Sequence, residues 1–311
     1  MPTLDWIGKS KVINHHQDVP FRVLERQYSY DQNGQHNEDN GSGNMIIRGD
    51  NLEALKALLP RYEGRVKCIY IDPPYNTGNE GWVYNDNVND PKIKKWLGEV
   101  VGKEGEDLTR HDKWLCMMYP RLRLLHKLLA DDGVIFISID DTEVSNLRLI
   151  CDEIFGYSSF LGDVAWQHSV QSNGYGGKFV SQYNHTLVYS KSSAFILGNL
   201  PRTDEDNKLY RNPDNDPRGP WRAGYCVNGL YRPNLKYEIH TPSGNIIQPP
   251  DKGWRWSWET MKAKMDIGEI IYNSDETSII HKLYLADLSG KVPENIWTNR
   301  SEERRVGKEC R

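Results

Sequence analysis

The stretch that decides the fold runs Ile69-Tyr70-Ile71-Asp72-Pro73-Pro74-Tyr75-Asn76-Thr77-Gly78. It continues an apolar run that begins at Val66 and is typical of a fully buried strand in a parallel sheet. The two prolines must end that strand, because proline cannot donate to a sheet ladder and fixes its own φ. The sequence therefore places a carboxylate, proline carbonyls and an aromatic ring at the carboxyl end of a strand, where open α/β sheets bind ligands.

These residue types suit chemistry at the amino group of a nucleobase. Such an amine is a poor nucleophile, because its lone pair is delocalised into the ring. Asp72 and the Pro73 carbonyl can accept its two hydrogens and free the lone pair. Tyr75 can stack on a base drawn out of the duplex, and Asn76 is a further candidate for contact with that base. The alternative is that this corner is only a strand-ending turn.

Strands and helices alternate around the corner, which predicts a parallel sheet covered by helices. The expected strands are 44–48, 66–71 and 134–139, and the expected helices are 51–59, 112–129 and 143–155. Pro60 is expected to stop the first helix, and Pro120 to kink or divide the second. Met117 and Met118 fall on the apolar face of that second helix and are expected in the core.

Later segments are expected to extend this sheet and to border its ligand-binding end. Residues 163–167 and 185–191 are expected to form an antiparallel pair at the sheet edge. The stretch 76–110 is rich in Gly, Asn and Asp and leaves the carboxyl end of the central strand. A loop of this length in a compact domain is usually functional or disordered, so we interpret it as a flap that orders on DNA.

The composition of the chain limits the classes of protein to which it can belong. The chain has 311 residues, a mass of 36.0 kDa and a formal net charge of −4, so no overall positive charge draws it to nucleic acid. Residues 201–264 are locally positive, with eleven Lys or Arg against eight Asp or Glu. Five scattered cysteines form no Cys-x-x-Cys pair, which indicates neither a zinc site nor a disulfide framework and is typical of a reduced cytoplasm. No apolar run approaches the length of a membrane span.

From about residue 200 the composition changes to Pro, Gly, Asn and aromatic residues. Trp254-Arg255-Trp256-Ser257-Trp258 alternates strictly, which predicts a strand that carries the three tryptophans on one face. We interpret those rings as a small β core in preference to direct base contacts. Arg255 would then lie on the opposite face and can reach DNA.

Five segments together resemble a known family, the amino-methyltransferases of DNA. The chain is most similar to the adenine-N6 enzymes of the β arrangement, and among them to the modification subunits of type III restriction–modification systems. The segments follow the family's order between about residues 44 and 300, and they are 48–56, 72–78, 114–122, 132–143 and 185–191.

The resemblance implies an α/β, incomplete Rossmann-like methyltransferase sheet with an inserted or appended target-recognition region. It divides the chain into an irregular N-terminal segment (1–43), a partial catalytic domain (44–200), a target-recognition region (201–297) and a tail expected to be foreign (298–311). It also implies methyl transfer from S-adenosylmethionine to N6 of a flipped adenine, with catalytic residues Asp72, Pro73, Pro74 and Tyr75. Phe179 would border the target base. Asp50 matches a position near the cofactor's adenosine, although it can equally cap the helix that begins at Asn51.

One family feature is absent from these 311 residues. The glycine-rich Asp-Pro-Phe-x-Gly-Ser-Gly segment, which holds the cofactor and follows the recognition region in the β arrangement, does not occur. We therefore expect a C-terminally truncated chain that is inactive by itself, and a central strand that lacks a neighbour on one side. No phosphate-binding loop for ATP is present, so cleavage would require a partner restriction subunit. Self-association is also expected of the full-length protein.

Three alternatives remain open at this stage. A cytosine-N4 methyltransferase would use the same corner, and Asp at position 72 favours adenine only by resemblance. A DNA-binding specificity subunit without its own chemistry would bind DNA equally well after Asp72→Ala. An enzyme that methylates amino groups of RNA or protein is the third alternative.

Overall fold

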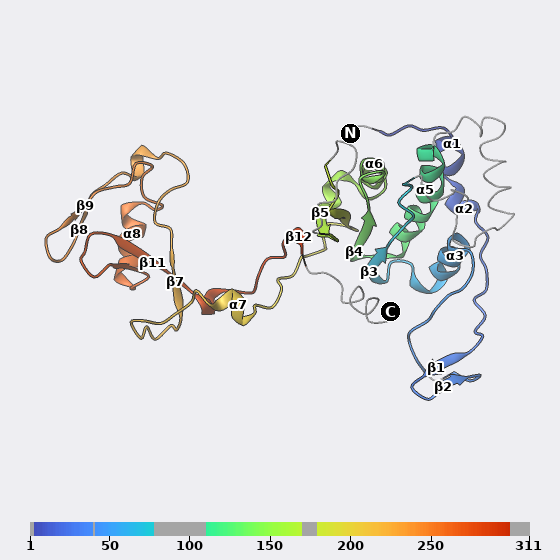
Figure 1. The fold of residues 1–311 in the computed structure, drawn as a ribbon, viewed down its shortest axis with the longest axis horizontal. Helices are drawn as coiled ribbons and strands as arrows, with labels where there is room; N and C mark the ends of the chain where they lie inside the picture. The colour runs from blue at the N-terminus through green and yellow to red at the C-terminus, as the bar shows by residue number, and fades with distance from the viewer. Residues whose placement is uncertain (1–2, 40, 78–109, 170–178, 299–311) are drawn as a thin grey trace. The chain divides into compact units, whose positions relative to one another are not determined.

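The computed structural model describes residues 3–39, 41–77, 110–169 and 179–298 (Figure 1). The chain forms two compact units, of which the first comprises residues 1–197 and 294–311 and the second comprises residues 198–293. The expected flap (76–110) lies almost entirely outside the described residues, as does the expected foreign tail from residue 299 onwards. Among the described helices, none is long and apolar enough to cross a membrane.

A mixed five-stranded sheet organises the first unit, in the order β12-β5-β6-β4-β3. Its strands are β3 (Val66–Ile71), β4 (Leu129–Ile139), β5 (Phe160–Gln167), β6 (Tyr183–Ser190) and β12 (Ile296–Trp297). The β3–β4 and β5–β12 pairs are parallel, whereas β6 runs antiparallel to both β4 and β5. The predicted antiparallel pair is confirmed, but β6 lies inside the sheet and not at its edge.

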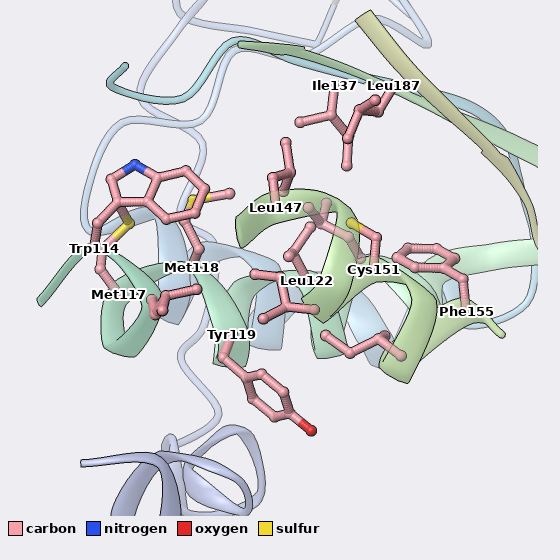
Figure 2. Packing of buried hydrophobic residues seen from close by; sticks show 14 of the residues in the cluster. Trp114, Met117, Met118, Tyr119, Leu122, Ile137, Leu147, Cys151, Phe155 and Leu187 are labelled. Atoms are coloured by element: carbon pink, nitrogen blue, oxygen red, sulfur yellow. The ribbon is translucent and has the colours of Figure 1, made fainter. Parts of the chain in front are cut away.

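Helices α5 (Arg110–Leu128) and α6 (Val144–Phe155) cover one face of this sheet (Figure 1). Figure 2 shows Met117, Met118 and Leu122 of α5 and Leu147 of α6 packed with side chains of β4 and β6. Met117 and Met118 are 3% and 2% exposed, which confirms the core placement predicted for them. The opposite face carries a smaller cluster, in which Val134, Val164 and Val188 pack with Phe136 and Phe195.

Helix α3 (Asn51–Tyr62) packs on α5 through Leu59, Leu124 and Leu128. Pro60 was expected to stop this helix, yet the helix continues for two residues beyond it. The cause is tertiary, because Tyr62 packs against the same leucine cluster and Glu63 still donates its N–H to the Leu59 carbonyl. Pro120 likewise lies within α5, which is one helix and is not divided there.

The N-terminal segment was expected to be irregular, and this expectation is wrong in part. It contains two short helices, α1 (Lys9–Val12) and α2 (His15–Asp18), and a hairpin of β1 (Ser29–Asp31) and β2 (Gly34–His36). Trp6 and Val12 belong to the main core cluster, so the segment gains its structure from burial against α5. The strand expected at 44–48 is not formed, since no described strand pairs with it and Ile46 is 95% exposed.

The environment of β3 differs from the expectation of a fully buried strand. Cys68 and Tyr70 are exposed, and β4 is the only strand that pairs with β3 among the described residues. Within the described ranges, β3 therefore lies at the edge of the sheet.

The second unit contains a three-stranded antiparallel sheet in the order β10-β11-β7. Its elements are α7 (Asp204–Asn207), β7 (Trp221–Gly224), β8 (Ile239–His240), β9 (Ile246–Ile247), α8 (Trp258–Asp266), β10 (Ile270–Tyr272) and β11 (Ile279–Tyr284). The strand predicted over 254–258 is wrong. Trp254 forms an isolated bridge with Val227, and α8 already begins at Trp258.

Candidate active site

The candidate site is the corner at which β3 ends. Ladder pairing between β3 and β4 ends at Ile71, opposite Ile137, and the chain then turns through Asp72, Pro73 and Pro74. The Asp72 side chain is exposed at this point, while both prolines are half-buried. The two prolines supply no N–H that could extend the ladder, so the strand must stop where the sequence predicted.

Tyr75 folds back towards the carboxylate of Asp72. Its hydroxyl forms hydrogen bonds with Asp72 and with Asn184 at the start of β6, while its half-buried ring packs against the main core. Burial, above all, and then the negative charge of Asp72 raise the pKa of the Tyr75 phenol far above its usual value. The phenol therefore stays protonated and acts as a donor to the Asp72 carboxylate.

The two proline carbonyls of the corner have different surroundings. The fully buried indole of Trp114, on α5, donates from Nε1 to the Pro74 carbonyl at 2.7 Å. The Pro73 carbonyl accepts no hydrogen bond from any residue that the structure describes. One carbonyl thus anchors the corner to α5, and the other remains available to a donor from outside the protein.

Asn76 faces the interior. It is fully buried, has a left-handed backbone conformation with φ 62°, and donates from Nδ2 to Oε1 of Glu143. This contact gives Asn76 a structural role, and the substrate contact predicted for it stays a prediction.

Glu143 is the centre of a buried hydrogen-bond network below the corner. Its side chain is 0% exposed and comes from the residue that precedes α6. Besides the amide of Asn76, its Oε1 contacts Nδ1 of His111 at 2.6 Å, and its Oε2 accepts from Nδ2 of Asn146 at 2.8 Å. Helix α6 was expected to begin at Glu143 and begins one residue later, with Glu143 at its N-cap position.

The remaining candidate residues are not joined to the corner by any hydrogen bond between described residues. Asp50 is the N-cap of α3, where its Oδ1 accepts from the N–H groups of Leu52 and Glu53 at 2.8 and 3.2 Å. Phe179 precedes β6 and has a fully exposed side chain. Arg255 belongs to the second unit, where it is exposed and its guanidinium lies 5.3 Å from the ring centroid of Trp256.

Several residues of the site were not singled out from the sequence, namely Trp114, Glu143, His111, Asn146 and Asn184. Trp114 and Glu143 lie within segments that carry the family resemblance, and this was the available signal. A carboxylate at the start of a helix, directly after a buried strand, can also be a simple cap. Its contact with Asn76, 67 residues earlier in the chain, is visible only in three dimensions.

The corner thus presents an exposed carboxylate beside an available proline carbonyl, at the carboxyl end of a strand in an α/β sheet. A family model described as DNA methylase (N6_N4_Mtase) matches residues 66–309, and the chain belongs to this family. The match extends to residue 309 and so includes most of the tail expected to be foreign, and the foreign origin of that tail stays a prediction.

Curated relatives give a consistent picture. The chain is 29% identical to the EcoP15I Mod subunit of a type III restriction–modification enzyme from Escherichia coli, over 93% of this chain and 52% of that protein. It is 33% identical to the StyLTI Mod subunit of Salmonella typhimurium, over 88% and 43% of the two chains. The type II methyltransferase M.KpnI of Klebsiella pneumoniae is 31% identical, over 73% and 55%. The chain thus spans about half the length of these relatives.

Solved structures that are similar include the complex of M1.HpyAVI with SAM, at 15% identity and a TM-score of 0.31, covering 51% of this chain and 60% of that one. The cytosine-N4-specific PvuII DNA methyltransferase matches at 15% identity and a TM-score of 0.30, covering 46% and 48%.

Proposed function

We propose that this chain carries the catalytic corner of a DNA methyltransferase that moves a methyl group from S-adenosylmethionine to N6 of adenine in double-stranded DNA. The observation that supports this most is that the exposed Asp72 carboxylate and the available Pro73 carbonyl belong to consecutive residues. Both are acceptors, and both follow directly from the end of β3. An amino group carries two hydrogens, so two fixed acceptors at one point suit it.

The chain's own residues prepare the amine. When Asp72 and the Pro73 carbonyl each accept one N–H, the nitrogen is drawn towards tetrahedral geometry and its lone pair becomes available. The bound cofactor supplies an electrophilic methyl group on a sulfonium. Because the prolines and the Trp114–Pro74 hydrogen bond fix both acceptors beforehand, most of the rate enhancement comes from positioning.

The target adenine must leave the duplex to reach these acceptors, since its amino group is otherwise paired. Tyr75 supplies an aromatic ring beside Asp72, and the exposed Phe179 is proposed as a second ring that borders the base. Stacking of this kind is worth about 1–3 kcal/mol per base.

The described residues are compatible with part of a cofactor site. Oδ1 of Asp50 caps α3, while Oδ2 accepts no hydrogen bond from another residue in the described ranges. That second oxygen at a helix N-terminus can accept from the hydroxyl groups of a nucleoside, and we propose Asp50 as a contact for the adenosine part of S-adenosylmethionine. The glycine-rich segment of the family would have to complete the site.

The second unit is proposed to recognise the target sequence, with the exposed Arg255 as a DNA contact. The relatives support further proposals, because two of them are Mod subunits of type III restriction–modification enzymes. We propose that the full-length protein works with a restriction subunit, self-associates and resides in the cytoplasm.

Methyl transfer from labelled S-adenosylmethionine to unmethylated DNA tests the proposal, with the nucleosides separated afterwards. The assay should use this chain and a longer version that restores the cofactor segment. We expect N6-methyladenine from the longer version, at least a hundredfold less from Asp72→Asn, and no change from Asp132→Asn. Asp132 is a matched control, because it is an exposed carboxylate at the amino end of β4, paired with Lys67.

The nucleoside product decides between the alternatives. If the product is N4-methylcytosine, the target base is cytosine and not adenine. DNA binding without any methylated nucleoside in the longer version, unchanged by Asp72→Asn, would contradict the proposed activity and favour a specificity subunit.

A further inference from the structure

Glu143 is a buried carboxylate for which the proposed reaction has no direct use. Its side chain is 0% exposed, yet no lysine or arginine of the described chain forms an ion pair with it. A buried carboxylate is costly unless hydrogen bonds surround it, and here the partners are Asn76, His111 and Asn146. These partners come from three separate places, which are the loop after β3, the start of α5 and the first turn of α6.

The contact with Asn76 bears most directly on the corner. Asn76 follows Tyr75 and has φ 62°, a left-handed conformation that is unfavourable for most residues and tolerated best by Gly and Asn. The amide of Asn76 is bonded to Glu143, so the hydrogen bond holds the backbone in this conformation. The direction in which the chain leaves the corner is therefore set by Glu143.

We propose that Glu143 is the positioning residue of the catalytic corner. Through Asn76 it fixes the segment just after Pro73, Pro74 and Tyr75, and through His111 and Asn146 it ties that segment to α5 and α6. We assign it no catalytic role, because its side chain is fully buried and its hydrogen bonds go to Asn76, His111 and Asn146. The inference rests on the proposed function only for its effect on rate, since the positioning of the corner is a property of this chain.

Trp114 provides a direct reporter of corner geometry. Its indole N–H donates to the Pro74 carbonyl, two residues before Asn76, so a displaced corner must weaken this bond. With ¹⁵N-labelled tryptophan in this 311-residue chain, Trp114→Phe assigns the indole resonance by its disappearance. The measurement needs no activity and no ligand.

The main comparison is between Glu143→Gln and Asp152→Asn. Asp152 is a matched control, because it is a buried carboxylate on the same helix whose partners are Arg148 and Tyr189. In Glu143→Gln we expect the Trp114 indole resonance to shift and its N–H to exchange with solvent about tenfold faster, as for a weakened hydrogen bond. In Asp152→Asn we expect neither change. Equal effects of the two variants, or no effect of Glu143→Gln, would overturn the inference.

A rescue experiment separates positioning from general stability. Asn76→Asp places two buried carboxylates together and should disturb the Trp114 resonance more than Glu143→Gln does. The double variant Asn76→Asp, Glu143→Gln restores a donor and an acceptor with their roles exchanged, and should return the resonance towards its original position. If Glu143→Gln does not fold, Asn76→Gly is the substitute, since it keeps the left-handed backbone and removes only the amide.

Kinetics complete the test. In a version of the protein that methylates DNA, Glu143→Gln should lower kcat by about 10- to 100-fold, while KM for DNA and for the cofactor stays within about twofold. A rise in KM with unchanged kcat would contradict positioning of the corner. A shifted Trp114 resonance without methyl transfer by any version would instead contradict the proposed function and leave the positioning role intact.

Discussion

The indole N–H of Trp114 donates to the Pro74 carbonyl at 2.7 Å, and this bond joins the long helix α5 directly to the corner that carries Asp72. Because Trp114 is completely buried, the bond lies in a medium where it is strong and where an unpaired donor would be costly. Helix α5 is thus both a core element and the support of the candidate active site.

Trp114→Phe should separate these two roles. We expect the free energy of unfolding to fall by about 1–3 kcal/mol, from the lost hydrogen bond and the smaller ring, as measured by urea denaturation. We also expect kcat for methyl transfer to fall by about 10- to 100-fold, because the corner loses its anchor. Trp254→Phe is the matched stability control, since the buried indole of Trp254 also donates to a carbonyl, that of Tyr237, at 2.8 Å. An intact kcat in Trp114→Phe would show that the bond serves stability alone.

Arg255→Ala tests the proposed recognition unit. The exposed guanidinium lies 5.3 Å from the centroid of the Trp256 ring, and a phosphate contact is the role proposed for it. We expect DNA affinity to fall several-fold and the slope of log K against log salt to decrease by about 1. Lys262→Ala, an exposed cation on α8 of the same unit, is the comparison. Identical losses from both variants would indicate a diffuse electrostatic effect and not a specific contact.

His126 gives the stability a dependence on pH. Burial, followed by the charges of Lys191 and Arg123, lowers the pKa of His126 to about 4, and Nζ of Lys191 donates to its Nδ1 at 3.2 Å. The pKa of histidine in an unfolded chain is about 6.5. Between pH 4 and pH 6.5, His126 is therefore protonated in the unfolded chain and neutral in the folded chain. The contribution to stability is therefore complete above about pH 6.5 and is lost as the pH falls towards 4.

The variant His126→Asn removes this titration, while its amide oxygen can replace Nδ1 as an acceptor for Lys191. Between pH 7.5 and pH 5 we expect the wild-type chain to lose about 1–2 kcal/mol more stability than the variant, after allowance for the partial exposure of the ring. Urea unfolding at the two pH values measures the difference. Parallel losses in both proteins would assign the pH dependence to other groups, such as His16, whose pKa is also lowered to about 4.

The elements that the sequence predicted well are those with a strong local pattern. The corner at Asp72, the apolar stripe of α5 and the pairing of β5 with β6 each follow from periodicity or from proline chemistry. The strand expected at 44–48 failed because a strand requires a partner, and none of the described strands pairs with it. Likewise, β4 is the only described strand that pairs with β3, and Cys68 and Tyr70 of β3 are exposed.

Local chemistry also overrode a regular pattern. The alternation of Trp254, Trp256 and Trp258 suggested a strand, but Ser257 caps helix α8 by accepting from the Thr260 N–H. A serine cap satisfies a helix N–H that alternation alone does not reveal. For the site, the sequence predicted the two acceptors of the corner, and their role stays a prediction. It did not point to Glu143, because the contact of Glu143 with Asn76 spans 67 residues of the chain.

The exposed edge of β3 leads to a prediction about self-association. Tyr70 is 64% exposed on this strand, and an edge that retains unpaired backbone groups and apolar side chains is a template for pairing with another chain. Tyr70→Lys should reduce aggregation of the chain during incubation at 37 °C, as measured by light scattering, because a charge on an edge strand opposes pairing. Tyr157→Lys is the control, since Tyr157 is 66% exposed but lies in the 3₁₀ turn Tyr157–Ser159, outside any strand. If both substitutions suppress aggregation equally, added net charge and not the edge is responsible. If Tyr70→Lys alone suppresses it, β3 is the surface through which the chain associates.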